Sequence, residues 1–159
     1  MRYVVVLCAI LLGACTGSPL QPDPITDAAS PLATQDRRQS FGGKPISAFL
    51  HGSHEVEAPG ADGSGHISMS FKPGQNEVCY ILTLMDIGTP TAASIHMAPA
   101  GQVGAAVLVL PTLTGTRSMA CFTDAREVVE AIFRTPEDYY VNVFTAAYPL
   151  GAIRGQLSK

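Results

Sequence analysis

The sequence contains no tryptophan, and only 14% of its 159 residues are charged, well below the quarter that is usual in soluble proteins. This shortage of charge excludes coiled coils and highly charged disordered chains. Acidic residues outnumber basic ones by 13 to 10, which gives a formal net charge of −3. Because phosphate recognition needs a basic surface, a nucleic-acid partner is excluded. Motifs of nucleotide-binding enzymes are also absent, and the length suits one domain with modest extra segments.

Long hydrophobic runs are absent as well, because the longest, Tyr3–Leu12, has ten residues. A ten-residue helix covers roughly 15 Å, half of what a bilayer core requires, so this run predicts the apolar core of a signal peptide. The sequence Leu12-Gly13-Ala14-Cys15 follows it and resembles the processing site of a bacterial lipoprotein. We therefore expect cleavage before Cys15 and a lipid on its thiol, so that residues 1–15 form the signal. The alternative is an ordinary secretory signal with a chance cysteine.

Residues 16–44 carry four prolines among small polar residues and show no apolar period. This composition favours extended chain and predicts a flexible tether. Thr16 stands where an inner-membrane lipoprotein commonly has aspartate. In a bacterium with two membranes, we therefore expect an exported protein on the periplasmic face of the outer membrane.

Residues 45–159 change to short β-rich runs separated by Gly and Pro, which predicts an all-β domain. Many short strands at regular spacing favour an antiparallel sandwich or barrel over a parallel sheet. One helix is expected near 124–134, with Asp124 and Glu127 as a capping box. The expected strands are 46–51, 65–71, 77–87, 92–98, 105–110, 117–122, 139–145 and 152–157.

The exported part has two cysteines, Cys79 and Cys121, each in an expected strand. An exported location is oxidising, so a disulfide is expected between them. Two free buried thiols are the alternative, because the pair lacks the spacing of a metal or redox motif.

Four stretches together resemble the CHRD (chordin-type) domain family over about residues 46–158. The resemblance implies an antiparallel Greek-key sandwich of immunoglobulin-like or copper-zinc superoxide dismutase-like outline. It also implies that Cys79 and Cys121 form the bridge found in many bacterial members, and it implies no catalytic activity. The four stretches are Leu50–Val56, Thr91–His96 with Gly101 and Gly104, Tyr140–Thr145 and Gly151–Leu157.

A metal-binding reading is the second hypothesis, with copper or zinc as the ion. Many family members read His-Ile-His where this chain has Ser94-Ile95-His96, and this chain has Phe144 where they have another histidine. His96 is therefore the one histidine left of three, which weakens the hypothesis. His51 and His54 are three apart and should point to opposite faces of a strand, unless a bulge brings them together. The remaining candidate ligand is His66.

A small serine hydrolase is the third hypothesis, with Ser94 as nucleophile and His96 as base. No nucleophile-elbow motif surrounds Ser94, and side chains two apart on a strand should run parallel instead of meeting. We therefore expect no enzyme and no cofactor.

The charged and amide residues of the family-like stretches predict a different kind of site. Glu55 and Arg154 could form a charge-assisted bond, with Asn142 and Gln156 capping loop backbone nearby. The same four groups could instead line a ligand-binding cleft. The sequence thus predicts a noncatalytic binding or structural module, held to a membrane by its lipid, whose partner is an envelope protein or glycan.

Overall fold

The computed structural model describes residues 45–111 and 113–159. The expected signal, the lipidated Cys15 and the tether lie outside the described residues. The described part is all-β with one short α-helix, as predicted. Its elements are β1 (Ile46–His51), η1 (Gly52–His54), β2 (Ser64–Lys72), η2 (Pro73–Gln75), β3 (Glu77–Met85), β4 (Pro90–Met97), β5 (Ala106–Val109), β6 (Arg117–Thr123), α2 (Arg126–Arg134), η3 (Pro136–Asp138), β7 (Tyr139–Thr145) and β8 (Ile153–Gln156).

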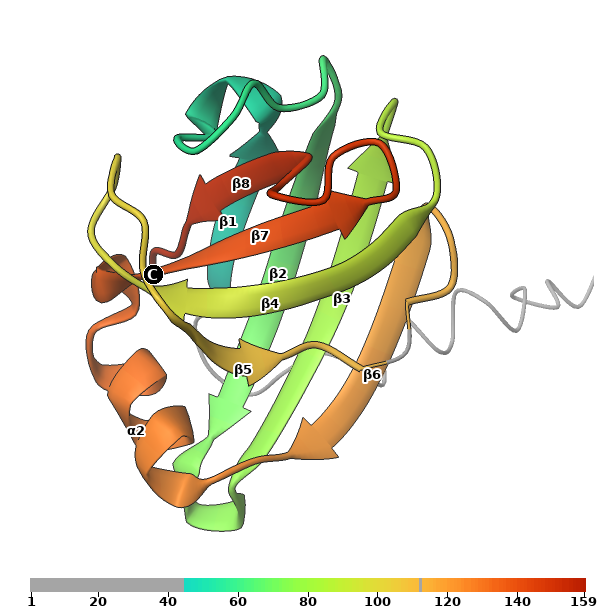
Figure 1. Ribbon diagram of the computed structural model, residues 1–159. Helices are drawn as coiled ribbons and strands as arrows, with labels where there is room; N and C mark the ends of the chain where they lie inside the picture. The colour runs from blue at the N-terminus through green and yellow to red at the C-terminus, as the bar shows by residue number, and fades with distance from the viewer. Residues whose placement is uncertain (1–44, 112) are drawn as a thin grey trace, which may run out of the picture. The chain divides into compact units, whose positions relative to one another are not determined.

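The strands form one antiparallel sheet that curls into two layers, in the order β5-β4-β7-β8-β1-β2-β3-β6. In Figure 1, β8, β7, β4 and β5 make the front layer and β1, β2, β3 and β6 the layer behind it. The layers are joined where β8 pairs with β1, through His51 and Arg154, and where Ser158 bridges to Ser47. The connections β3–β4, β5–β6 and β6–β7 cross between the layers, which is the Greek-key pattern.

The core lies between the two layers and is built by strict alternation along each strand. In β3, Val78, Tyr80, Leu82 and Leu84 all face inward and are at most 2% exposed. In the opposite layer, Val141 and its neighbours on β4 and β8 are equally buried. Among the described residues, no helix is long and apolar enough to cross a bilayer.

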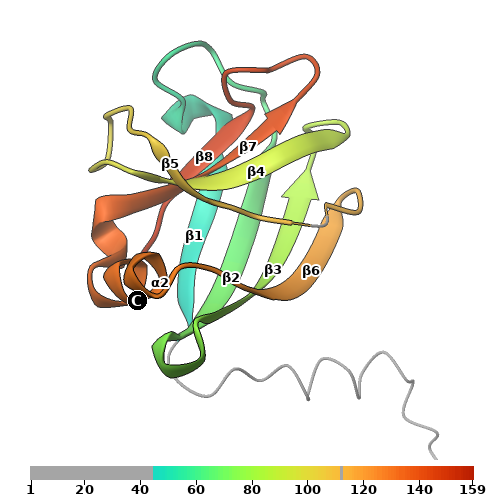
Figure 2. The ribbon, with the colours of Figure 1, turned by 60° about the horizontal axis from the view of Figure 1, so that its bottom comes forward.

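Helix α2 begins later than expected and without the predicted capping box. Its N-cap is Ala125, whose methyl side chain cannot accept a hydrogen bond. Asp124 instead accepts a hydrogen bond from the Ala125 amide. Val129 and Ile132 are buried against the sheet, whereas Phe133 is 42% exposed. The helix lies against β2 and η2, at the lower end of the sheet in Figure 2.

The predicted disulfide is confirmed. Cys79 of β3 and Cys121 of β6 lie directly opposite each other in the sheet, with 4.0 Å between their Cα atoms. Strand β6 is one free edge of the sheet and pairs only with β3 among the described strands. The disulfide therefore fastens this edge strand to its one neighbour.

Candidate functional site

A block of polar side chains occupies the outer face of the layer formed by β4, β7 and β8. The register places it in two rows across the three strands. Outward-facing residues normally meet solvent. Here most are buried, and Tyr140 and Arg154 are only 2% and 3% exposed. The rows are Ser94–Asn142–Arg154 and His96–Tyr140–Gln156.

The centre of this block is the Tyr140 ring. The His96 imidazole stacks against it with 5.0 Å between ring centroids, and the Arg154 guanidinium lies 3.4 Å from the ring centroid. Arg154 also donates a hydrogen bond to the backbone carbonyl of Gln102. A cation held by an aromatic face and a carbonyl has little freedom to move, so Arg154 presents a fixed positive charge.

Ser94 and His96 meet, so the expectation that they run parallel without contact is wrong. Their Oγ and Nε2 atoms are 2.8 Å apart, and His96 Nδ1 lies 2.9 Å from the carbonyl oxygen of Gly104. The carbonyl can only accept, so Nδ1 carries the proton and Nε2 accepts from Ser94. Ser94 is 7% exposed, which places it poorly for attack on a substrate.

Gln156 joins three parts of the domain. Its side-chain amide donates to the carbonyls of Ala98 and Glu137, at 3.0 and 2.7 Å, and thereby links β8 to the loop after β4 and to η3. The fourth predicted residue, Asn142, is 5% exposed, and its Oδ1 has no hydrogen-bond partner in the described part of the chain.

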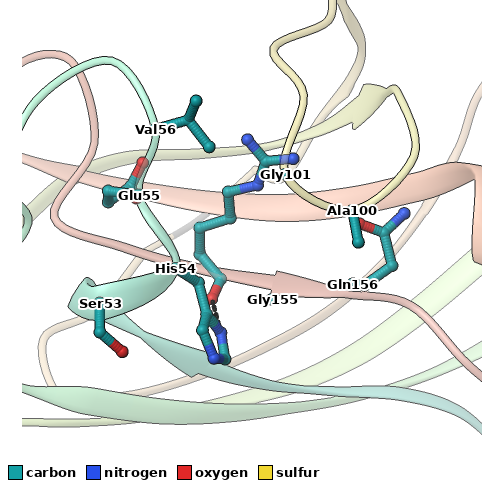
Figure 3. Close-up of a pocket in the computed structure, with 9 residues that line it drawn as sticks. Ser53, His54, Glu55, Val56, Ala100, Gly101, Gly155 and Gln156 are labelled. Atoms are coloured by element: carbon teal, nitrogen blue, oxygen red, sulfur yellow. Dashed lines mark hydrogen bonds between the residues drawn. The ribbon is translucent and has the colours of Figure 1, made fainter.

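Two loops cover one end of this block and leave a pocket of roughly 390 Å³ between them. One loop follows β1 and carries Glu55, and the other follows β4 and carries Gly101; Figure 3 shows them on opposite sides of the opening. Of the four charged and amide residues predicted to lie together, Glu55, Arg154 and Gln156 line the pocket, and Asn142 does not. The complete lining is Ser53, His54, Glu55, Val56, Ala100, Gly101, Arg154, Gly155 and Gln156.

Glu55 and Arg154 share this pocket without the direct bond that the sequence suggested. Arg154 bonds to Gln102 instead, and Glu55 Oε1 is buried with no hydrogen-bond partner among the described residues. The carboxyl rests against Gly151, whose φ of 139° favours glycine and where an added Cβ would come within 2.5 Å of Glu55 Oε2. The Glu55 carboxyl is therefore packed against backbone, and its Oε1 atom accepts no hydrogen bond from the described residues.

Burial raises the pKa of Glu55 from 4.5 to about 7, against an opposing effect of the Arg154 charge and with a smaller increase from Glu57. The folded protein holds this proton more tightly than the unfolded chain. The contribution of Glu55 to the free energy of unfolding should therefore be most favourable below pH 4.5. It should decline as the pH rises from 4.5 to about 7.

Replacing Glu55 by Gln should remove this decline. Because the group is half exposed, we expect the variant to gain roughly 1–2 kcal/mol at pH 8 and little at pH 4.5. Urea unfolding of both proteins at the two pH values measures the difference. An equal gain at both pH values would show that the substitution acts through packing and not through ionisation.

Of the remaining histidines, His54 lines the pocket, whereas His51 and His66 lie on strands of the other layer. The turn η1 brings the His51 and His54 rings to 6.0 Å between centroids, and His54 Nδ1 lies 3.1 Å from the Arg154 carbonyl. His66 lies on the outer face of β2 and packs on the Phe49 ring at 4.8 Å. In residues 45–111 and 113–159, no group of three or more His, Cys, Asp or Glu side chains could hold a metal ion.

Sequence reasoning missed Gln102, which holds Arg154, and the role of Gly104, which holds His96. Both act through backbone carbonyls, so their side chains give no signal. It also missed the role of Tyr140. The alternation within the stretch 140–145 was a usable signal, because it places Tyr140 on the same face as Asn142.

The family model of the CHRD domain matches residues 46–157, from the first described strand to just past the last. No curated protein and no solved structure matches the chain.

Proposed function

This chain belongs to the CHRD domain family, and on that premise we propose that it is a membrane-anchored lipoprotein whose domain is a noncatalytic binding module of the cell envelope. The signal resemblance at Leu12–Cys15 supports the anchor, and the Pro-rich residues 16–44 support a tether that gives the domain reach. In a bacterium with two membranes, the module stands on the periplasmic face of the outer membrane.

The observation that carries the binding role is the separation of Glu55 from Arg154 within one pocket. Glu55 contributes an unused buried acceptor, and Arg154 contributes donors on a guanidinium that Tyr140 and Gln102 hold in place. Buried acceptors without partners are costly, so a bound group that donates to Glu55 and accepts from Arg154 would be stabilised.

Hydroxyl groups suit this arrangement because each one donates and accepts. The pocket has the size of a small-ligand site, and its one cation, Arg154, shares it with a carboxyl group, which disfavours a highly charged ligand. Val56 and Ala100 supply apolar surface for the carbon face of a ring. We therefore assign the pocket to one sugar unit of an envelope glycan.

Binding of neutral hexoses and N-acetylhexosamines to the full-length protein in detergent tests this role, with saturation-transfer NMR as the measurement. Glu55→Ala should lower the affinity for the sugar about tenfold or more, and tenfold is equivalent to about 1.4 kcal/mol. Glu57→Ala is the matched control, because it removes an exposed carboxylate from the same loop. Absence of sugar binding, or equal loss in both variants, would contradict the assignment.

The anchor has a separate test. The wild-type protein should enter the detergent-rich phase of a two-phase extraction from its producing bacterium, whereas Cys15→Ala should move to the aqueous phase or remain unprocessed. The reason is that acyl chains contribute about 0.8 kcal/mol for each buried methylene. Unchanged size and partitioning of the Cys15→Ala variant would refute the lipid anchor and leave the pocket unaffected.

A further inference from the structure

A second group of potential ligands lies on the outer face of the opposite layer, in a groove that shares Ser53 and His54 with the lining of the sugar pocket. Ser64 of β2 pairs with His51 of β1 on one side and with Met85 of β3 on the other. His66 is two residues further along β2 and therefore points to the same face as Ser64. The small Ser64 side chain thus sits among two imidazoles and a thioether.

These four residues line one shallow groove of roughly 360 Å³. Met85 is 57% exposed, so its thioether is accessible from this groove. In the register, residues on neighbouring strands that are offset by two lie within reach of long side chains. His66 stands in this relation to both His51 and Met85, so the three side chains can converge above Ser64.

Two of the side chains are already oriented. The Phe49 ring packs against His66, with 4.8 Å between centroids, and limits its movement. Nδ1 of His51 accepts a hydrogen bond from the Ser53 backbone N–H and lies 3.0 Å from Ser53 Oγ, and these contacts orient the ring. A metal at Nε2 requires the other tautomer, in which Nδ1 donates to the Ser53 oxygen, as is common for metal-bound histidines.

The kind of donor selects the kind of metal. None of the residues that line the groove is acidic, so magnesium, calcium and manganese lack the oxygen ligands that they prefer. Thioether sulfur is a soft ligand that favours Cu(I), and imidazole suits copper equally well. Zinc also binds imidazole, but it gains little from a thioether.

We propose that His51, His66 and Met85 form a surface site for a single Cu(I) ion above Ser64. The described residues form no group of three or more His, Cys, Asp or Glu that could hold a metal. This finding does not bear on the proposed site, because one of its three ligands is a methionine. None of the three proposed ligands lines the sugar pocket, although Ser53, which contacts His51, does. The site binds the ion without a redox step, since Cu(I) is taken up as supplied.

The test is anaerobic competition for Cu(I) against a chromogenic chelator, with ascorbate as reductant. The full-length protein is used in detergent, with Cys8 and Cys15 replaced by Ser so that their thiols do not bind copper. One Cu(I) per chain is expected, with at least a tenfold loss of affinity in Met85→Leu and in His66→Asn. X-ray absorption of the complex should show one sulfur ligand at about 2.3 Å, as found for other metal–sulfur bonds.

Met97→Leu is the matched control, because Met97 is 55% exposed but lies on the other layer. Its affinity should equal that of the parent protein. Absence of Cu(I) binding, equal affinity of the Met85→Leu variant, or an equal loss in Met97→Leu would each overturn the proposal. Zn²⁺ binding that is as tight as Cu(I) binding and insensitive to Met85→Leu would also overturn it.

Discussion

Replacing Gly155 by Ala is expected to lower the free energy of unfolding by about 3 kcal/mol or more. Gly155 lies on β8 where this strand passes over β1. A Cβ added there would be 2.2 Å from the carbonyl oxygen of Phe49 and 2.8 Å from its carbonyl carbon. Both are backbone atoms, so no side-chain rotation can relieve the contact.

The position of this contact increases its effect. The pair His51–Arg154 is the one register pair that joins β8 to β1 among the described strands, and it is adjacent to Gly155. Moving β8 outward to accept a methyl group would open the curled sheet along this seam. It would also displace Arg154 from the Tyr140 ring and so disturb the pocket.

The expected thermal midpoint is about 10–20 °C below that of the wild type, given the usual relation between free energy and melting temperature for a domain of this size. Circular dichroism during heating measures it. Gly74→Ala is the matched control, because an added Cβ there meets no atom within 4 Å and the backbone φ is not positive. This control should melt within a few degrees of the wild type. A similar result for Gly155→Ala would show that the seam can widen without cost.

The strands were predictable from the sequence because burial on one face imposes a period of two on their side chains. The run Val78–Leu84 shows this period, and β3 follows it. Capping is less predictable, since Asp124 has a choice of backbone amides. It bonds to the next residue, Ala125, and not to the helix interior as the Asp124–Glu127 spacing suggested.

The site was predictable only in part, for a physical reason. Its residues lie on strands, but the loops that bury them contribute backbone carbonyls, which every residue type carries. Gly104 orients His96 and Gln102 holds Arg154 in this way. The sequence therefore indicates which side chains are polar and outward-facing, whereas the loop fold decides that Glu55 is left unpaired and that Ser94 meets His96.

Removing the disulfide should have the largest effect on the free edge of the sheet. The bond joins Cys79 to Cys121 across 42 residues of chain, a span that contains β4 and β5. In the chain-entropy model, a loop of this length stabilises the folded state by about 4 kcal/mol, because the unfolded chain is restricted. Strand β6 pairs with β3 alone among the described strands, so apart from the bond its attachment to the sheet depends on this one ladder.

The double variant Cys79→Ala/Cys121→Ala should therefore melt roughly 15 °C or more below the oxidised wild type. The reduced wild type supplies the matched comparison, because it lacks the bond but keeps both cysteine side chains. Its melting temperature should approach that of the double variant. Reductant should leave the double variant unchanged, since no disulfide remains among the described cysteines to be broken.

Two outcomes would contradict this account of the edge strand. If the double variant melts with the oxidised wild type, β6 is held by packing and hydrogen bonds alone. If the double variant melts far below the reduced wild type, the loss comes from the cavity left at Cys79, which is 3% exposed, and not from the freed chain. Hydrogen exchange then distinguishes the two cases. Loss of the bond should first expose the amides of β6, which pairs with no further described strand. A cavity should instead affect β3 around Cys79 and the residues of β2 that pair with it.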